Sequence, residues 1–185
     1  MANPISRIVI LDGALAPNTW TLVESNQPLA AAAVADGSVL PLSVWLAVRE
    51  DAVLKSKRVG VWLSPSDEPG ELAEDIATLP LIAVQFPAFT DGRGYSIGRL
   101  LRERYGYKGE MRAIGDVGRD HLFNLFHCGF NAFEIKPSQT PEHALEGLKA
   151  FSDGYQSSEQ RKLPAYRRRP HAQTADSWAE ISSPS

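Results

Sequence analysis

Short apolar runs alternate with segments of helical spacing through most of this chain. Four runs have the length and composition of buried strands: Val59–Leu63, Leu81–Phe86, Met111–Ile114 and Ala132–Ile135. Each is followed closely by a helix-like segment: Gly70–Leu79, Tyr95–Tyr105, Arg119–His127 and a last helix that begins at Thr140. The alternation predicts an α/β fold of four consecutive strand–helix units with parallel strands and right-handed crossovers. A closed eight-unit barrel needs about 250 residues, so four units predict a half-barrel or an open sheet.

The ends of the chain have a different character. Arg7–Leu11 is a short apolar run before the turn signal Asp12-Gly13, and Trp20–Glu24 is a second strand candidate, so we expect a small hairpin or edge ribbon. Pro28–Ser38 resembles a linker, and helical spacing starts at Pro41. We therefore expect three parts: an N-terminal β segment and linker (1–40), an α/β core (41–151) and a polar, extended or disordered tail with a basic cluster (152–185).

Composition narrows the class of protein. A hydrophobic share of 43% over 185 residues allows one domain with a substantial core. The net charge of −3 argues against a general nucleic-acid binder. The single cysteine, Cys128, excludes an internal disulfide framework and a multi-cysteine metal site, and it fits a reducing cytoplasm. We find neither a signal-peptide pattern nor an apolar stretch of transmembrane length, so we expect a cytoplasmic protein.

Two turns of similar composition follow consecutive predicted strands. The first, Thr90–Gly94, follows the run Leu81–Phe86, and the second, Gly115–Asp120, follows the run Met111–Ile114. If both strands are parallel, both turns emerge at the carboxyl edge of the sheet, where α/β proteins place their ligand sites. The two turns together therefore indicate a candidate site.

The first turn is suited to an anion. Backbone N–H groups around Gly92 and Gly94 can hold an anion at a helix start, and Arg93 can add charge-assisted hydrogen bonds. Nearby Thr90, Tyr95 and Arg99 would complete the lining. In the structural alternative the glycines only permit the turn and Asp91 caps the helix. Neither the Rossmann glycine spacing nor a Walker-type Gly-Lys-Ser/Thr is present.

The second turn adds acidic and basic groups. Asp116 or Asp120 could orient an arginine, bind a metal or act as a general base, and Arg119 could contact an anion. The structural alternative is that acidic residues in a first helical turn complement the helix dipole. Asp91, Asp116 and Glu134 follow one another on successive units and are candidate ligands for Mg²⁺, although an ion pair of Glu134 with Lys136 or Arg112 is equally natural.

The string FTDGRGYS, continuing through LLRER, KGEMRAIGDVGRD and HCGFNAFEI, resembles an uncharacterised bacterial family. That family is described as oxidoreductase-like and linked to sulfite reduction, because its genes often neighbour the gene of the sulfite reductase hemoprotein. The resemblance spans roughly residues 40–151. The chain departs from the pattern at Ile97, Gly98, His127 and Asn131, where Gln, Ala, Arg and Asp are expected.

The resemblance implies an accessory protein of assimilatory sulfite reduction, with the hemoprotein subunit as a partner. The sequence carries no redox-cofactor motif, so such a protein would act on a partner's cofactor. Sulfite and sulfate are anions, which an Arg- and Gly-lined site suits. Three alternatives stay open: a metal-dependent, enolase-like half-barrel enzyme acting on a small carboxylate, a non-catalytic interaction module, and a half-barrel that pairs with a second copy. A redox role for Cys128 requires a neighbouring base, and packing is the simpler interpretation.

Overall fold

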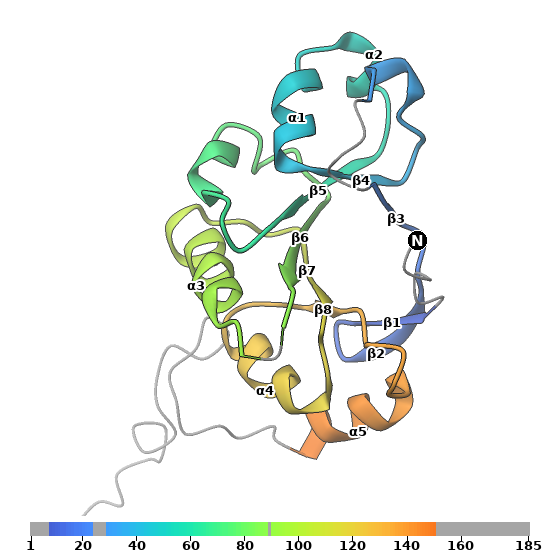
Figure 1. Cartoon of the computed structure of the whole chain (residues 1–185), viewed down its shortest axis with the longest axis vertical. Coiled ribbons are helices and arrows are strands. Elements are labelled where there is room, and N and C mark those ends of the chain that lie inside the picture. The colour runs from blue at the N-terminus through green and yellow to red at the C-terminus, as the bar shows by residue number, and fades with distance from the viewer. Residues whose placement is uncertain (1–7, 24–28, 89, 151–185) are drawn as a thin grey trace, which may run out of the picture.

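The computed structural model describes residues 8–23, 29–88 and 90–150, which form one mixed α/β unit (Figure 1). Its strands are β1 Ile8–Leu11, β2 Ala14–Pro17, β3 Thr21–Leu22, β4 Ser38–Pro41, β5 Val59–Leu63, β6 Leu81–Phe86, β7 Glu110–Gly115 and β8 Ala132–Phe133. The α-helices are α1 Leu42–Val48, α2 Ala52–Lys55, α3 Arg93–Arg99, α4 Arg119–His127 and α5 Pro141–Ala150. The other helical segments are the 3₁₀ turns η1 Ala31–Ala33 and η2 Pro69–Leu72 and the π-helical turn η3 Leu100–Arg104, which continues α3.

All eight strands join one curled sheet in the order β2-β1-β8-β7-β6-β5-β4-β3. Strands β3 to β8 run parallel, while β1 is antiparallel to both β2 and β8. The two edge strands, β2 and β3, are separated in sequence only by Asn18–Trp20. Because so short a link spans at most about 14 Å, the sheet must curl until its edges approach each other. The expected α/β class, parallel strands and half-barrel shape are confirmed.

The expected pattern of four strand–helix units is only approximate. The helix predicted over Gly70–Leu79 is the short turn η2 followed by further turns, in which the Thr78 hydroxyl donates to the Asp75 carbonyl at 2.8 Å. The helix predicted over Tyr95–Tyr105 begins at Arg93 and changes into the π-helical turn. The helix over Arg119–His127 has the predicted bounds.

The N-terminal hairpin differs from the expected one. Asp12 and Gly13 have φ angles of 50° and 77°, the left-handed conformation that a two-residue hairpin turn requires. The chain therefore reverses at once, and the partner of β1 is Ala14–Pro17. The strand predicted over Trp20–Glu24 is present as β3, Thr21–Leu22, in the described residues. It pairs with β4 at the other end of the sheet, so the expected hairpin between this strand and β1 was wrong. The tail 152–185 lies outside the described residues.

The two faces of the sheet bury different sets of side chains. The outer face packs under the helices in a large apolar cluster that includes Leu63, Val84 and Phe133. The concave face holds a smaller cluster: Trp20, Val39, Trp62, Leu81, Ala83 and Ile114. Alternation along each parallel strand produces the two sets. None of the helices in residues 8–23, 29–88 and 90–150 is long and apolar enough to cross a membrane.

Candidate functional site

The two turns lie side by side at the carboxyl edge of β6 and β7. The strands are paired in parallel along their whole length, with Phe86 opposite Gly115. The backbone N–H of Asp116 donates to the carbonyl of Phe86 at 2.7 Å, which ties the start of the second turn to the end of β6. Gly115 has a φ of 98°, and a Cβ there would lie 2.4 Å from the Phe86 carbonyl oxygen. Glycine is therefore needed for the close approach of the two turns.

In the first turn Asp91 holds Arg93 in a fixed orientation. Arg93 Nε donates to Asp91 Oδ1 at 3.0 Å and Nη2 donates to Oδ2 at 2.7 Å, a bidentate pair. The backbone N–H of Arg93 also donates to Asp91 Oδ1, at 3.1 Å. The Asp91 side chain is 16% exposed, whereas that of Arg93 is 62% exposed. The hydrogen bond from Arg93 is the main reason that the pKa of Asp91 lies below its ordinary value.

The other predicted residues of the first turn have separate surroundings. Gly94 is buried, and a Cβ there would lie 2.5 Å from Phe86 Cζ, so this glycine serves helix–strand packing. Tyr95 packs edge-on against Phe86 with ring centroids 5.3 Å apart. Gly92 and Thr90 are exposed, and no atom lies within 4 Å of a Cβ placed at Gly92. In this turn Gly94 and Tyr95 therefore pack against Phe86, whereas Thr90 and Gly92 are exposed to solvent.

Arg99 lies farther along the same helix. It is exposed, and its Nη2 donates to Glu103 Oε1 at 3.1 Å, one helical turn away. Arg102, by contrast, is half-buried and donates to the backbone carbonyls of Tyr107, Gly109 and Gly129. Arg102 therefore fixes the connection between α3 and β7, and Arg99 is left on the surface.

In the second turn the Asp116 carboxylate forms an ion pair with Lys136. Lys136 Nζ donates to Asp116 Oδ1 at 2.9 Å, and the two side chains are 29% and 34% exposed. Lys136 lies after β8, so a third connection reaches the same edge of the sheet. Asp116 therefore has an ion-pair partner, Lys136, that was not among the partners expected for it.

Arg119 and Asp120 begin α4. The Arg119 backbone N–H donates to Gln139 Oε1 at 2.8 Å, and its Nη1 lies 2.9 Å from His143 Nε2. A Cβ at Gly147 would lie 2.5 Å from Arg119 Nε, so the arginine side chain lies flat along α5. Asp120 is exposed in the first turn of α4, where a carboxylate complements the helix dipole. Arg119 therefore joins α4 to α5, and its backbone N–H already has an acceptor.

The three carboxylates considered for Mg²⁺ do not come together. Asp91 is bound to Arg93 and Asp116 to Lys136, while Glu134 lines a hollow on the concave face. Across residues 8–23, 29–88 and 90–150, no group of three or more His, Cys, Asp or Glu side chains is placed to hold a metal ion. Arg112, one of the partners considered for Glu134, lines the same hollow and forms an ion pair with Glu110 at 2.6 Å.

The chain matches a family model, Bacterial protein of unknown function (DUF934), over residues 60–166. It belongs to this family. The DUF934 match begins within β5, includes both turns and Lys136, and extends past the end of α5. No curated protein matches the chain.

Asn131 is one of the positions at which this DUF934 chain departs from the pattern expected for the family. Asn131 lies just before β8, at the edge of the sheet opposite the two turns, where its Nδ2 donates to Asp12 Oδ1 at 2.9 Å and its Oδ1 accepts from Arg102. Its role there is structural.

Lys136 and Gln139 contact residues of the second turn, Asp116 and Arg119, and were not predicted as site residues. Both lie in the segment that follows a predicted parallel strand, and that position was the signal that could have indicated them.

Proposed function

We propose that this protein is an accessory protein of assimilatory sulfite reduction that binds a small oxyanion where β6, β7 and β8 end. The proposal rests on the Arg93 guanidinium, which one carboxylate orients and which is still exposed to solvent. Asp91 takes Nε and one Nη2 hydrogen, and Nη1 has no acceptor in the part of the chain that the structure describes. A guanidinium that is oriented by one carboxylate and still mostly exposed can hold an oxyanion without first being ordered.

Lys136 supplies a second cation at the same edge. It is tied to Asp116, whose backbone N–H is bonded to the last residue of β6. An ammonium group has three donors, and Asp116 Oδ1 takes one of them. The proposed site therefore consists of two cations, each oriented by its own aspartate, with Thr90 on the exposed side of the first turn. The backbone N–H groups of Arg93 and Arg119 already have acceptors, so the side chains carry the binding.

The pathway is supported by the resemblance described above, and the charge of the site is compatible with it. Sulfite and sulfate are small oxyanions that arginine and lysine bind well. Since the sequence has no redox-cofactor motif, electron transfer belongs to a partner such as the sulfite reductase hemoprotein. The metal-dependent enolase-like alternative has no comparable support, because its three candidate ligands lie apart.

A growth experiment tests the pathway and the site together. In a bacterium carrying this gene, a deletion strain is grown on sulfate or on cysteine as sole sulfur source. We expect slow growth on sulfate, normal growth on cysteine, and rescue by the wild-type gene and by Arg99→Gln. Arg93→Gln should fail to rescue although it accumulates to the same level. Arg99 is the matched control because it is an exposed arginine on the same helix with its own carboxylate partner.

The outcomes separate the hypotheses. Normal growth of the deletion strain on sulfate would remove the pathway assignment. Rescue by Arg93→Gln would keep the pathway and reject the anion site. Co-purification with sulfite reductase, combined with rescue by Arg93→Gln and no response to sulfite, would favour a non-catalytic interaction module.

A further inference from the structure

The segment after β8 brings a second polar side chain, Gln139, to the edge of the sheet that holds Lys136. The two residues close a turn in which the Gln139 backbone N–H donates to the Lys136 carbonyl at 3.0 Å. The Lys136 N–H donates to the Val117 carbonyl, also at 3.0 Å, which fixes this turn to the one after β7. Both side chains are half-buried. Backbone hydrogen bonds therefore hold the two side chains at the same edge.

The Gln139 carboxamide has a fixed orientation. Its Oε1 accepts the backbone N–H of Arg119 at 2.8 Å, and only the oxygen of a carboxamide can accept such a bond. Nε2 is therefore the donor end, and no described residue accepts either of its two hydrogens. The backbone N–H of Gly118, at the start of α4, already donates to His121 Nδ1 at 3.2 Å. The donors that remain here belong to the Gln139 side chain and not to these N–H groups of the helix.

Gly118 brings this carboxamide next to Lys136. A Cβ at Gly118 would lie 3.3 Å from Lys136 Cε, 3.2 Å from Gln139 Oε1 and 3.4 Å from Gln139 Nε2. The lysine and the carboxamide therefore lie within 3.4 Å of one point, on the same side of the second turn. A larger side chain at position 118 would press on both groups, so glycine permits their approach.

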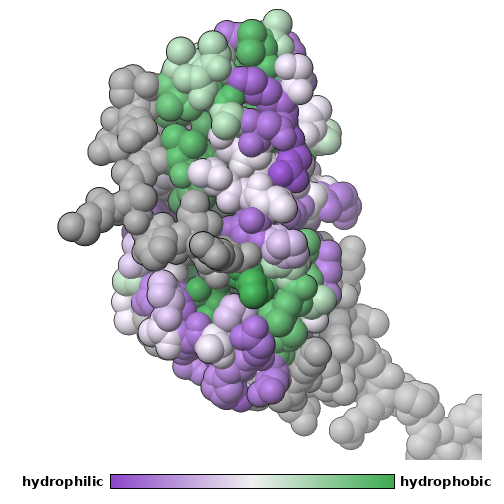
Figure 2. Space-filling view, turned by 90° about the vertical axis from the view of Figure 1, so that its right-hand side faces the viewer, coloured by the Kyte–Doolittle hydropathy of each residue, from purple (hydrophilic) through white to green (hydrophobic). Residues whose placement is uncertain are grey.

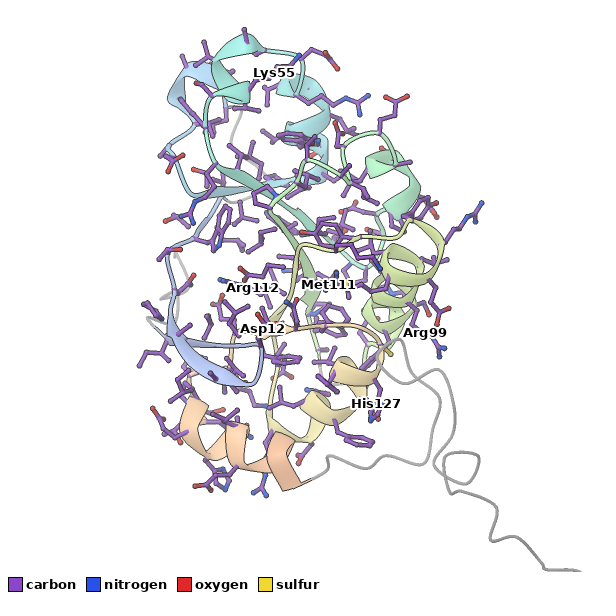
Figure 3. All side chains as sticks on the ribbon, turned by 180° about the vertical axis from the view of Figure 1, so that it is seen from behind. Asp12, Lys55, Arg99, Met111, Arg112 and His127 are labelled. Atoms are coloured by element: carbon purple, nitrogen blue, oxygen red, sulfur yellow. The ribbon has the colours of Figure 1, made fainter. Side chains whose placement is uncertain are left out.

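Solvent reaches this pair from the side of α5. Gln139 precedes α5, whose first turn exposes Glu142 and His143. Figure 2 shows a largely hydrophilic surface at the end of the molecule where α5 lies. In Figure 3 α5 lies beside α4, and the labelled His127 marks the carboxyl end of α4, away from Gln139. The carboxylates of Glu142 and Asp120 are exposed, so water and salt screen their repulsion of an anion.

We propose that Gln139 is a ligand-binding residue of the oxyanion site and that, with Lys136, it holds two oxygens of one oxyanion. The inference rests on the proposed oxyanion site and adds a neutral donor to its two cations. Because Oε1 is occupied, the carboxamide offers only donors to a ligand and takes an unprotonated oxygen. The class of ligand is therefore a small oxyanion with two or more unprotonated oxygens on one atom, as in sulfite and sulfate.

The substitution Gln139→Glu separates binding from structure. A carboxylate oxygen can still accept the Arg119 N–H, and a negative charge is favourable at the start of α4, so the melting temperature should equal or exceed that of the wild type. Both donor hydrogens are lost, so calorimetric titration of the intact protein with sodium sulfite should show at least about tenfold weaker binding. Asn124→Asp adds the same charge at an exposed position of α4 and should bind sulfite nearly as tightly as the wild type.

The outcomes distinguish this inference from the proposed site. If Gln139→Glu binds sulfite as tightly as Asn124→Asp does, Gln139 is only a cap of α4 and the inference is wrong. A melting temperature well below that of the wild type would contradict the orientation of the carboxamide and overturn the inference as well. Absence of binding in the wild type would remove the oxyanion site itself, whereas binding that requires Arg93 and not Gln139 would reject this inference alone.

Discussion

Asp116 Oδ1 accepts a hydrogen bond from Lys136 Nζ at 2.9 Å, which joins the turn after β7 to the segment after β8. With the bond from the Asp116 N–H to the Phe86 carbonyl, three consecutive connections are tied together at one edge of the sheet. Ligand sites of parallel α/β proteins lie at this edge, because all the connections that follow the strands meet there. The relationship places Lys136 in the proposed site and gives Asp116 a positioning role.

The first prediction concerns the acid–base behaviour of Asp91. In wild-type protein its pKa should lie below that in Arg93→Gln, because the hydrogen bond from Arg93 stabilises the carboxylate. A folded-state pKa that is lowered adds stability above the ordinary pKa, and that stability is lost as the pH falls through the lowered value. Carboxyl ¹³C titration by NMR measures both values. Equal values in the two proteins would contradict the ion pair.

The second prediction separates the two glycines of the first turn. Gly94→Ala should destabilise the protein by roughly 1–3 kcal/mol, because the new Cβ would press on the Phe86 ring. Gly92→Ala should cost less than about 1 kcal/mol, since its Cβ would meet no atom within 4 Å. Urea unfolding of both variants measures the difference. A Gly92→Ala that unfolds more easily than Gly94→Ala would show that the turn packs differently.

The third prediction concerns the ion pair between buried Arg112 and half-buried Glu110 on the concave face. Arg112→Ala should cost about 2–3 kcal/mol, because it leaves the half-buried Glu110 without its partner. Arg99→Ala breaks an exposed pair with Glu103 and should cost less than about 1 kcal/mol. Chemical unfolding of the two variants side by side is the measurement. A double variant, Glu110→Leu with Arg112→Met, should recover most of the loss, and failure to do so would mean that Arg112 acts mainly through its hydrogen bond to Asn18 Oδ1.

The fourth prediction concerns Cys128. Burial is the main reason that its thiol pKa lies above the ordinary value, and the nearby charge of Arg99 offsets this only in part. At pH 7.5 the thiol should therefore react with a maleimide several-fold more slowly than free glutathione does, and unfolding in urea should remove the difference. A folded protein that reacts faster than glutathione would indicate an activated thiol and reopen a redox role.

Sequence periodicity predicted the parallel core well, because the apolar runs that became β5 to β8 are buried and α4 has a strong apolar face. It could not predict the hairpin partner of β1. Ala14–Pro17 is a mostly exposed edge strand without alternation of apolar and polar residues, so nothing in the sequence marks it as a strand. Trp20 is apolar because it packs in the cluster on the concave face, and this made the following segment look like the partner of β1. The closeness of the two sheet edges could not be predicted from the sequence pattern, because it depends on the pairing of segments that are far apart in the sequence.

The candidate site was predictable as a location and less so as a set of contacts. The Asp91–Arg93 pair lies within one turn, so local spacing indicated both residues. Lys136 reaches Asp116 from the next strand–helix unit, and only the parallel register of β7 and β8 brings them together. Arg119 is a cation at the same edge of the sheet, but its side chain contacts His143 of α5.

Calorimetric titration with sulfite tests the central claim most directly. Wild-type protein and Arg99→Gln should bind sulfite with the same affinity, and Arg93→Gln should bind at least about tenfold more weakly, since a hydrogen bond to a charged group is lost. Lys136→Gln should weaken binding as well. Heat of binding that is absent in the wild type, or unchanged in Arg93→Gln, would contradict an oxyanion site built on this arginine.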